Sequence, residues 1–244
     1  MSLSRDHARL TSAASLCLPG TLAALVLMLG CSYPKAIDTY EFLDQYDHMT
    51  DRFDPVISLV YLDPAADISR YRNFIVGNVA VGRHWVEDQK AAQSYATLFR
   101  NLMARELVEA NRFDYVILDP SFRHRSPMLR MEAMVTIFDT GSGVCRFFSY
   151  FLFPLQKPGA TDLQIEGRLY DTATGEVVME FVDRRRHLGN TPWGPTPATF
   201  RDEFVMKQTV LETARALALF ISRAHEGTLP QPDEPSPQGQ EAAE

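Results

Sequence analysis

An aspartate that could take part in acid–base chemistry lies in the segment Val135–Ser142, which reads Val-Thr-Ile-Phe-Asp-Thr-Gly-Ser. Where two Asp-Thr-Gly turns face each other, their carboxylates share one proton and can polarise a water molecule and a carbonyl group. The second Asp-Thr of the chain, at Asp171, continues as Ala-Thr-Gly and so breaks this motif. Since aspartate and glycine are also the residues that a turn after a strand needs, we expect Asp139 to end a strand without a catalytic role.

The cysteine at position 31 predicts attachment of a lipid. Residues 21–29 are almost wholly apolar, follow a weakly basic N-terminus and lead directly into Gly30 and Cys31. Such a run is typical of a secretory signal peptide, and at about 1.5 Å per residue it covers less than half of a bilayer core of roughly 30 Å. The ending Met28-Leu29-Gly30-Cys31 resembles a bacterial lipobox, in which cleavage before the cysteine accompanies transfer of a diacylglycerol to its sulfur. We therefore expect the mature chain to begin at lipidated Cys31.

Loss of residues 1–30 leaves a chain of one-domain length. Cys17 leaves with the signal peptide, so Cys145 has no partner for an intramolecular disulfide. The core must then hold the domain together unaided, and 45% hydrophobic residues supply ample material for it. The formal charge of −7 gives no basic surface of the kind that a nucleic-acid partner requires.

Histidine and arginine offer two further kinds of site. No two histidines of the mature chain have the four-residue helical spacing of a zinc site, and we expect no metal or other cofactor. The basic runs 123–125 and 183–187 could contact lipid phosphates or another anion, since guanidinium groups bind phosphate through paired hydrogen bonds. The candidate residues in the second run are Arg184, Arg185 and Arg186. A solvated strand end or loop is the commoner origin of such short charged runs, and we favour that interpretation.

The segment Phe147–Phe153 reads Phe-Phe-Ser-Tyr-Phe-Leu-Phe, with five aromatic residues in seven positions. It is too short for a transmembrane helix. We favour a core strand or a cover over the open face of the sheet, because large apolar patches on monomers are rare. The alternative is contact with a membrane or a partner protein beside the lipid anchor. The side chains that would make this contact are those of Phe147, Phe148, Tyr150, Phe151 and Phe153.

Hydrophobic periodicity predicts the elements that must position these residues. Two helices are expected, one over residues 87–109 with a stop at Asn111, and one from about Thr199 to His225 with Thr196 or Thr199 as its cap. Strands adjacent in sequence favour antiparallel pairing. The fold class is therefore α+β, a mostly antiparallel mixed sheet with two amphipathic helices packed on one face as a two-layer sandwich. Six strands are expected, near residues 56–61, 74–81, 114–118, 129–138, 163–169 and 177–181.

Three local features complete the expected domain. Gly77, in the middle of the second predicted strand, indicates a bulge or a close packing contact. The segment Asp171–Gly175 between the last two strands is typical of a hairpin loop with glycine at its end. Ahead of the first strand, the polar residues of the linker are interleaved with aromatic ones, and we expect these aromatic side chains to dock on the domain.

Several segments together resemble a known family. Residues 42–46 and 61–72, with residues 167–177 and 181–185 further along, are similar to a bacterial lipoprotein family catalogued as domain of unknown function 3313. The resemblance extends from about Phe42 to the last predicted helix. It implies an exported lipoprotein and, because the family has no established activity, it implies no catalytic residues.

The sequence thus predicts a signal peptide over residues 1–30, a lipid-proximal linker over 31–52, a single α/β domain over 53–226 and a disordered, acidic, proline-rich tail over 227–244. We expect a non-catalytic binding or assembly module of the cell envelope, held at the outer membrane and facing the periplasm. Its expected partners are the membrane, through the lipid, and envelope proteins or further copies of itself. The alternative is an extracytoplasmic hydrolase with an aspartic-protease-like turn at Asp139.

Overall fold

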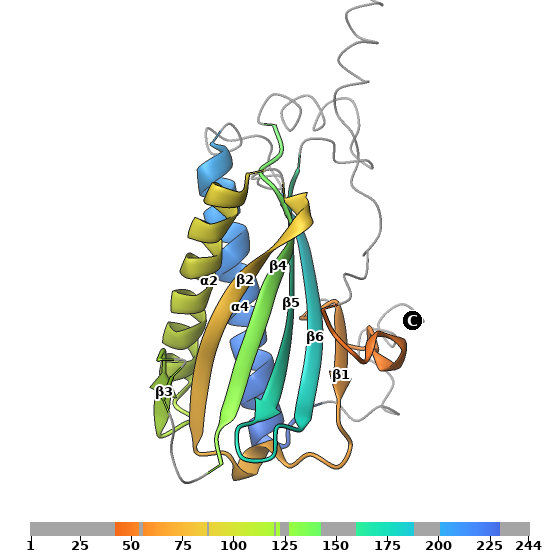
Figure 1. The fold of residues 1–244 in the computed structure, drawn as a ribbon, viewed down its shortest axis with the longest axis vertical. Coiled ribbons are helices and arrows are strands. Elements are labelled where there is room, and N and C mark those ends of the chain that lie inside the picture. Colours follow the sequence, from red (N-terminus) through yellow and green to blue (C-terminus); the bar gives the residue numbers. More distant parts are fainter. Residues whose placement is uncertain are drawn as a thin grey trace, which may run out of the picture.

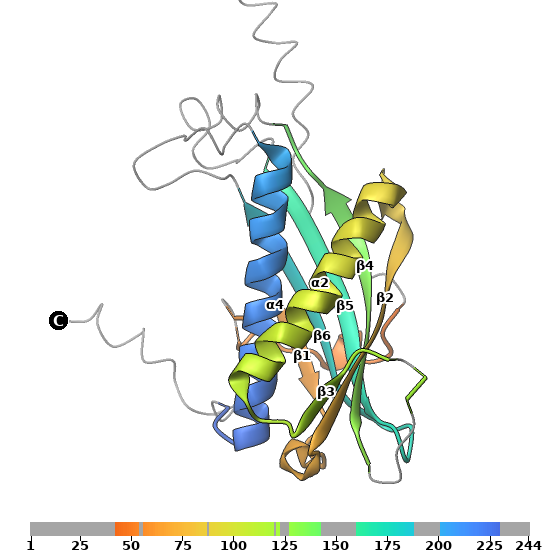
Figure 2. The same cartoon turned by 90° about the vertical axis from the view of Figure 1, so that its left-hand side faces the viewer.

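Two long helices cover one face of a six-stranded sheet (Figures 1 and 2). The computed structural model of the protein describes residues 42–53, 56–86, 88–119, 121–122, 127–142, 160–187 and 201–229. Within these ranges the predicted order of six strands and two helices is confirmed. The elements are the 3-10 turn η1 (Tyr46–His48), β1 (Leu59–Leu62), the 3-10 turn η2 (Ile68–Arg70), β2 (Asn73–Val86), α2 (Gln89–Ala110), β3 (Tyr115–Ile117), β4 (Leu129–Asp139), β5 (Thr161–Asp171), β6 (Val177–His187) and α4 (Asp202–Glu226).

The sheet is mixed, with the strand order β1-β6-β5-β4-β2-β3. The pairs β1–β6, β4–β5 and β5–β6 are antiparallel, whereas β2 runs parallel to both β3 and β4. The expectation of a mostly antiparallel sheet therefore holds only approximately. The α+β class is confirmed. Helix α2 returns the chain to the end of the sheet where β2 began, and a strand that follows such a crossover lies parallel to the one before it.

The helix boundaries follow from capping. The side chain of Asp88 accepts a 2.9 Å hydrogen bond from the backbone N–H of Ala91 and so begins α2. Asn111 adopts the left-handed conformation at φ 53° and ends this helix, as predicted. The prediction of Thr196 or Thr199 as the cap of α4 is wrong. Arg201 occupies the N-cap position and makes no capping hydrogen bond through its side chain. Two acidic residues in the first turn instead suit the positive end of the helix dipole.

The core lies between the sheet and the two helices. Odd-numbered residues of β5 point towards the helices, and the Thr161 hydroxyl lies 3.4 Å from that of Thr209 in α4. Successive side chains of a strand alternate between the two faces. The even-numbered residues of β5 therefore point to the opposite face, away from α2 and α4.

Two glycines behave as predicted. At Gly77 an added Cβ would lie 2.4 Å from the carbonyl oxygen of Met131, and the β2–β4 register shifts between Val76 and Val79. Both the close contact and the irregularity expected at this position are confirmed. Gly175 has φ 77° and ends the hairpin loop between β5 and β6, also as expected.

Candidate functional site

The sheet face opposite the helices carries buried polar side chains. Four of them, on β5 and β6, have no exposed surface: Asp162, Gln164, Glu166 and Glu180. Burial of a carboxylate is unfavourable unless charged or hydrogen-bonded partners compensate for the lost water. The hydrogen-bond partners of these four side chains therefore identify the segments that cover this face of the sheet.

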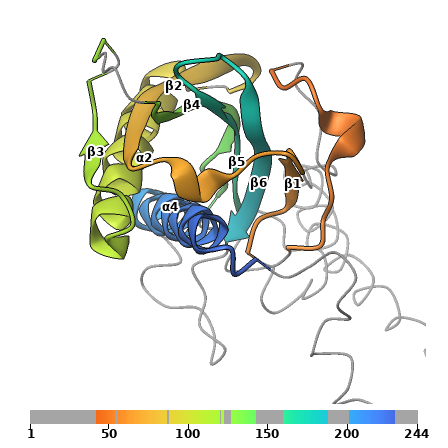
Figure 3. The same ribbon diagram turned by 90° about the horizontal axis from the view of Figure 1, so that it is seen from below.

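The N-terminal segment 42–50, which we call the strap, packs on this face. Seen from below, η1 of the strap and α4 lie on opposite sides of β6 (Figure 3). The carboxylate of Glu180 accepts hydrogen bonds from the backbone N–H groups of Asp44, at 3.2 Å, and Gln45, at 2.8 Å. The side chain of Leu43 is buried beside them. The strap is thus held by the sheet through its main chain as well as its side chains.

Aromatic side chains of the strap reinforce this contact. The hydroxyl of Tyr46 donates a hydrogen bond to the carboxylate of Glu166. The ring of Phe42 lies 5.5 Å from the guanidinium carbon of Arg168, a cation–π distance. At the far end of the strap, Thr50 forms two backbone hydrogen bonds with Val60 of β1. Residues 42–50 of the predicted linker are therefore part of the folded domain.

Glu166 is the centre of a buried hydrogen-bond network. Its other carboxylate oxygen accepts a 2.8 Å hydrogen bond from the side-chain amide of Gln164. Burial raises the pKa of the Glu166 carboxyl above its ordinary value, and hydrogen bonds from Tyr46, Gln164 and Thr136 oppose this rise. Tyr46 of the strap therefore donates its hydrogen bond to a carboxyl group whose pKa is raised by burial.

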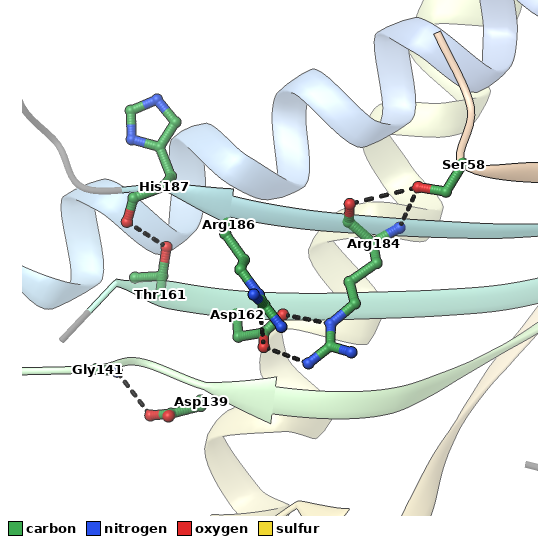
Figure 4. A network of polar contacts seen from close by, with 8 residues as sticks. All are labelled: Ser58, Asp139, Gly141, Thr161, Asp162, Arg184, Arg186 and His187. Atoms are coloured by element: carbon green, nitrogen blue, oxygen red, sulfur yellow. Dashed lines mark hydrogen bonds and ion pairs between the residues drawn. The ribbon is translucent and has the colours of Figure 1, made fainter. Parts of the chain in front are cut away.

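Farther along the same face, Asp162 binds two arginines (Figure 4). Its carboxylate accepts hydrogen bonds from Nε of Arg184 at 2.9 Å and from Nη2 at 2.6 Å, and a third from Nε of Arg186 at 3.3 Å. Arg185 points to the other face of the sheet, where it pairs with Asp183 at 2.7 Å.

The pairing of these arginines corrects one expectation and leaves another open. The run does lie at a strand end, since β6 stops at His187, but it is not solvated: the side chain of Arg184 is only 6% exposed and that of Arg186 22%. Each of the three guanidinium groups contacts an internal carboxylate, and Arg184 and Arg186 share that of Asp162. Their contact with an external anion stays a prediction.

Asp139 closes its own turn. Its carboxylate accepts a 2.7 Å hydrogen bond from the backbone N–H of Gly141, as expected of an aspartate that ends a strand. Asp162 is its cross-strand partner in β5. Figure 4 shows the Asp139 carboxylate turned towards Gly141, whereas the Asp162 carboxylate faces the two arginines. The two groups are thus occupied separately and do not form a pair that shares a proton.

Other predicted site residues lie outside the described parts of the chain. These are Cys31, the basic run 123–125, and the aromatic residues Phe147, Phe148, Tyr150, Phe151 and Phe153. The register Asp139–Asp162 places the end of β4 beside the start of β5, so the chain leaves and re-enters the sheet at one end.

The sequence analysis missed the buried carboxylates that hold the strap. Their signal was the polar set that alternates with the apolar one along residues 161–171, together with an isolated glutamate in the last strand at position 180. Alternation predicts a polar face. It does not identify what covers that face, since the strap is more than a hundred residues away in sequence.

Two properties concern only the described residues. No group of three or more His, Cys, Asp or Glu side chains among them could hold a metal ion. Of the helices that the structure describes, none combines the length and the apolar character needed to cross a membrane.

The fold and this face define an α+β domain whose polar sheet surface is covered in part by its own N-terminal strap. Residues 38–201 match the model of the family described as "Protein of unknown function (DUF3313)", and the chain belongs to this family. Among solved structures, the chain is similar to a PelC L103M dodecamer from Paraburkholderia phytofirmans, with 14% identity, a TM-score of 0.41 and coverage of 65% of this chain and 96% of that one. It is also similar to a DUF330 protein from Xanthomonas campestris, with 11% identity, a TM-score of 0.43 and coverage of 69% and 93%. No curated protein matches the chain.

Proposed function

We propose that this protein is a lipid-anchored component of the cell envelope that acts as a binding or assembly module, not as an enzyme. The observation that carries the proposal is the apolar run 21–29 that ends in Gly30-Cys31. The thiol of Cys31 is the proposed site of the lipid. The proposed location is the outer membrane, with the domain facing the periplasm.

The strap gives the anchored domain a defined reach. Ten residues lie between Cys31 and Phe42, the first described residue of the strap, so eleven Cα-to-Cα steps join the two. Because an extended chain spans at most about 3.3–3.6 Å per residue, this tether can extend roughly 40 Å. Without the strap contacts, the free segment would be longer and would extend to β1, which begins at Leu59. Docking of the strap therefore keeps the domain close to the membrane and limits its rotation.

Two surfaces are proposed for binding. The aromatic segment Phe147–Phe153 is proposed to contact a membrane or a partner protein. The arginine run of β6 is proposed as a weaker contact for anions. Arg186 would make this contact in preference to Arg184, because its side chain is 22% exposed, compared with 6% for that of Arg184.

Detergent-phase partitioning tests the anchor. The wild-type chain should enter the detergent phase after expression in a bacterium that processes lipoproteins. Cys31→Ala should stay in the aqueous phase, and Cys145→Ala, the matched control, should behave as the wild type. Each buried methylene of an acyl chain contributes about 0.8 kcal/mol of membrane affinity, so loss of the lipid should be decisive. A Cys31→Ala chain of precursor length that still partitions with membranes would identify residues 21–29 as part of a transmembrane anchor and contradict the proposal.

A further inference from the structure

A groove of about 570 Å³ lies where the end of the strap, β1 and the C-terminal end of α4 meet. The residues that line it come from the segments 48–53, 60–64 and 224–229. Most of their side chains are apolar or aromatic, namely those of Phe53, Val60, Tyr61, Leu62, Pro64, Ala224 and Leu229. Grooves lined in this way bind proline-rich segments, which enter as a preformed polyproline II helix at low entropic cost. The groove is therefore suited to an extended, proline-rich peptide.

The ionisable side chains of this groove are basic. Arg52 and His48 line it, both are exposed, and no Asp or Glu occurs among the described residues that line it. Arg52 forms no ion pair with another residue that the structure describes. The ring centroids of His48 and Tyr61 lie 6.4 Å apart, so the histidine borders the aromatic part of the groove. A peptide that carries carboxylates beside its prolines would match both the apolar lining and the charge.

The chain itself leads out of this groove. Gly227 follows α4 in the left-handed conformation at φ 67°, and the backbone N–H of Thr228 donates a 2.9 Å hydrogen bond to the carbonyl of Arg223. Beyond this turn the side chain of Leu229 packs against the core and lines the groove. Leu229 is the last residue that the structure describes, so the segment that follows it starts at the groove.

We propose that the groove binds the chain's own segment 230–235, which reads Pro-Gln-Pro-Asp-Glu-Pro. In polyproline II each residue advances about 3.1 Å, so Asp233 and Glu234 lie roughly 12–16 Å beyond the last described residue. Their carboxylates match the basic side chains of the groove, and the prolines match its apolar lining. The docked segment joins the end of α4 to the strap. It also shields the edge strand β1, which the strap pairs with only through the bridge between Thr50 and Val60.

Disulfide formation in the full chain with Cys145→Ser tests the position of the segment. The groove pair combines Pro232→Cys with His48→Cys, and the control pair combines it with Arg223→Cys, at an exposed position on α4 outside the groove. The backbone of Arg223 lies beside that of Thr228, so an undocked segment would reach the control cysteine at least as readily. Docking should make the groove pair cross-link about tenfold faster within one chain, as mapped by mass spectrometry of the linked peptides. Equal rates, or a disulfide between two copies, would overturn the proposal.

Charge reversal tests the choice of occupant. In the groove pair, Arg52→Glu should slow cross-linking about fivefold, which is the scale of an ion pair at an exposed position. Arg52→Lys keeps the charge and should leave the rate within about twofold of that of the groove pair. Adding Asp233→Lys and Glu234→Lys to Arg52→Glu should restore the rate, since the signs are then opposite again. An unchanged rate in Arg52→Glu, or no restoration by the added lysines, would overturn the acidic segment as the occupant.

Discussion

The carboxylate of Glu180 accepts a 2.8 Å hydrogen bond from the backbone N–H of Gln45, a residue 135 positions earlier in the chain. Glu180 has no exposed surface, so a carboxyl group removed from water is used to hold the main chain of the strap. The contact lies just ahead of η1, whose first turn begins at Tyr46. Backbone N–H groups at the start of a helical turn have no partner within the turn, so they can donate hydrogen bonds to a carboxylate.

Replacement of Glu180 should release the strap. In the chain from residue 31 with Cys31→Ser, Glu180→Ala should lower the free energy of unfolding by about 1–3 kcal/mol, because two backbone donors lose their acceptor. The amides of Asp44 and Gln45 should exchange hydrogen much faster, while those of β5 remain protected. The matched control is Glu176→Ala in the exposed hairpin loop, which should change neither quantity. Unchanged exchange at Asp44 and Gln45 would contradict the docking of the strap through this carboxylate.

Stability should depend on pH through Glu166. Burial raises the pKa of this carboxyl in the folded protein above the ordinary value of 4.5. The folded state then binds the proton more tightly than the unfolded chain does. The stability that Glu166 contributes is therefore fully present below about pH 4.5 and is lost as pH rises through the folded-state pKa.

Glu166→Gln isolates this effect because it keeps a neutral hydrogen-bonding group at all pH values. The free energy of unfolding of Glu166→Gln, relative to that of the wild type, should increase as pH rises from 4.5 towards 7, because only the wild type loses stability over this range. Urea unfolding at several pH values measures this difference. Glu176→Gln serves as the control and should run parallel to the wild type. A Glu166→Gln curve that is also parallel would show that this carboxyl does not couple folding to pH.

Asp162 and Asp139 are cross-strand neighbours that should differ in importance. Asp162→Asn leaves Arg184, with a 6% exposed side chain, without its charged partner. The loss of one member of a buried ion pair costs roughly 3–5 kcal/mol. Asp139→Asn keeps an oxygen that can accept from Gly141 and should change the free energy of unfolding by less than about 0.5 kcal/mol. Equal effects of the two substitutions in urea unfolding would contradict the assigned roles.

The hydrolase alternative has its own test at Asp139. The binding proposal expects no cleavage of peptide substrates at acidic pH by the wild-type chain. Asp139→Asn removes the carboxylate and preserves the turn, so it is the matched inactive variant. Cleavage by the wild type that is abolished in Asp139→Asn would favour the enzyme over the binding module.

Thermal unfolding should separate the two interpretations of the aromatic segment. Truncation of a buried phenylalanine to alanine costs about 3–5 kcal/mol. We expect a split between Phe148→Ala and Phe151→Ala, with one variant melting much lower and the other melting as the wild type but associating more weakly with membranes or partner proteins. Equal and severe destabilisation by both would rule out a contact surface made by these rings.

Local sequence signals predicted much of the fold. The alternation over residues 129–138 predicted β4, and Asn111 and Gly77 marked a helix end and a close contact that the structure confirms. The last strand was predicted too short. Its charged run was attributed to a strand end or loop, because nothing local shows that Arg184 has a buried carboxylate opposite it on β5.

Features that depend on distant partners were not predicted. The short run that forms β3 carries no signal for its parallel pairing with β2, which is set by the crossover through α2. Docking of aromatic side chains from the linker was predicted and is confirmed by Tyr46 and Phe42, but the buried carboxylates of Glu166 and Glu180 that hold the strap were not predicted. A threonine cap was preferred for α4 on local preference, but the helix begins later, after Arg201.

The central claim, that a lipid-anchored domain is tethered through a docked strap, is tested most directly by mass spectrometry of the N-terminal peptide from the membrane-bound protein. The account predicts that this peptide begins at Cys31 and carries the added mass of a diacylglycerol on its sulfur. The chain of Cys31→Ala, analysed in the same way, should lack that modified peptide. A mature protein whose N-terminal peptide still contains residues 21–29, or begins at Cys31 without added lipid, would contradict the account.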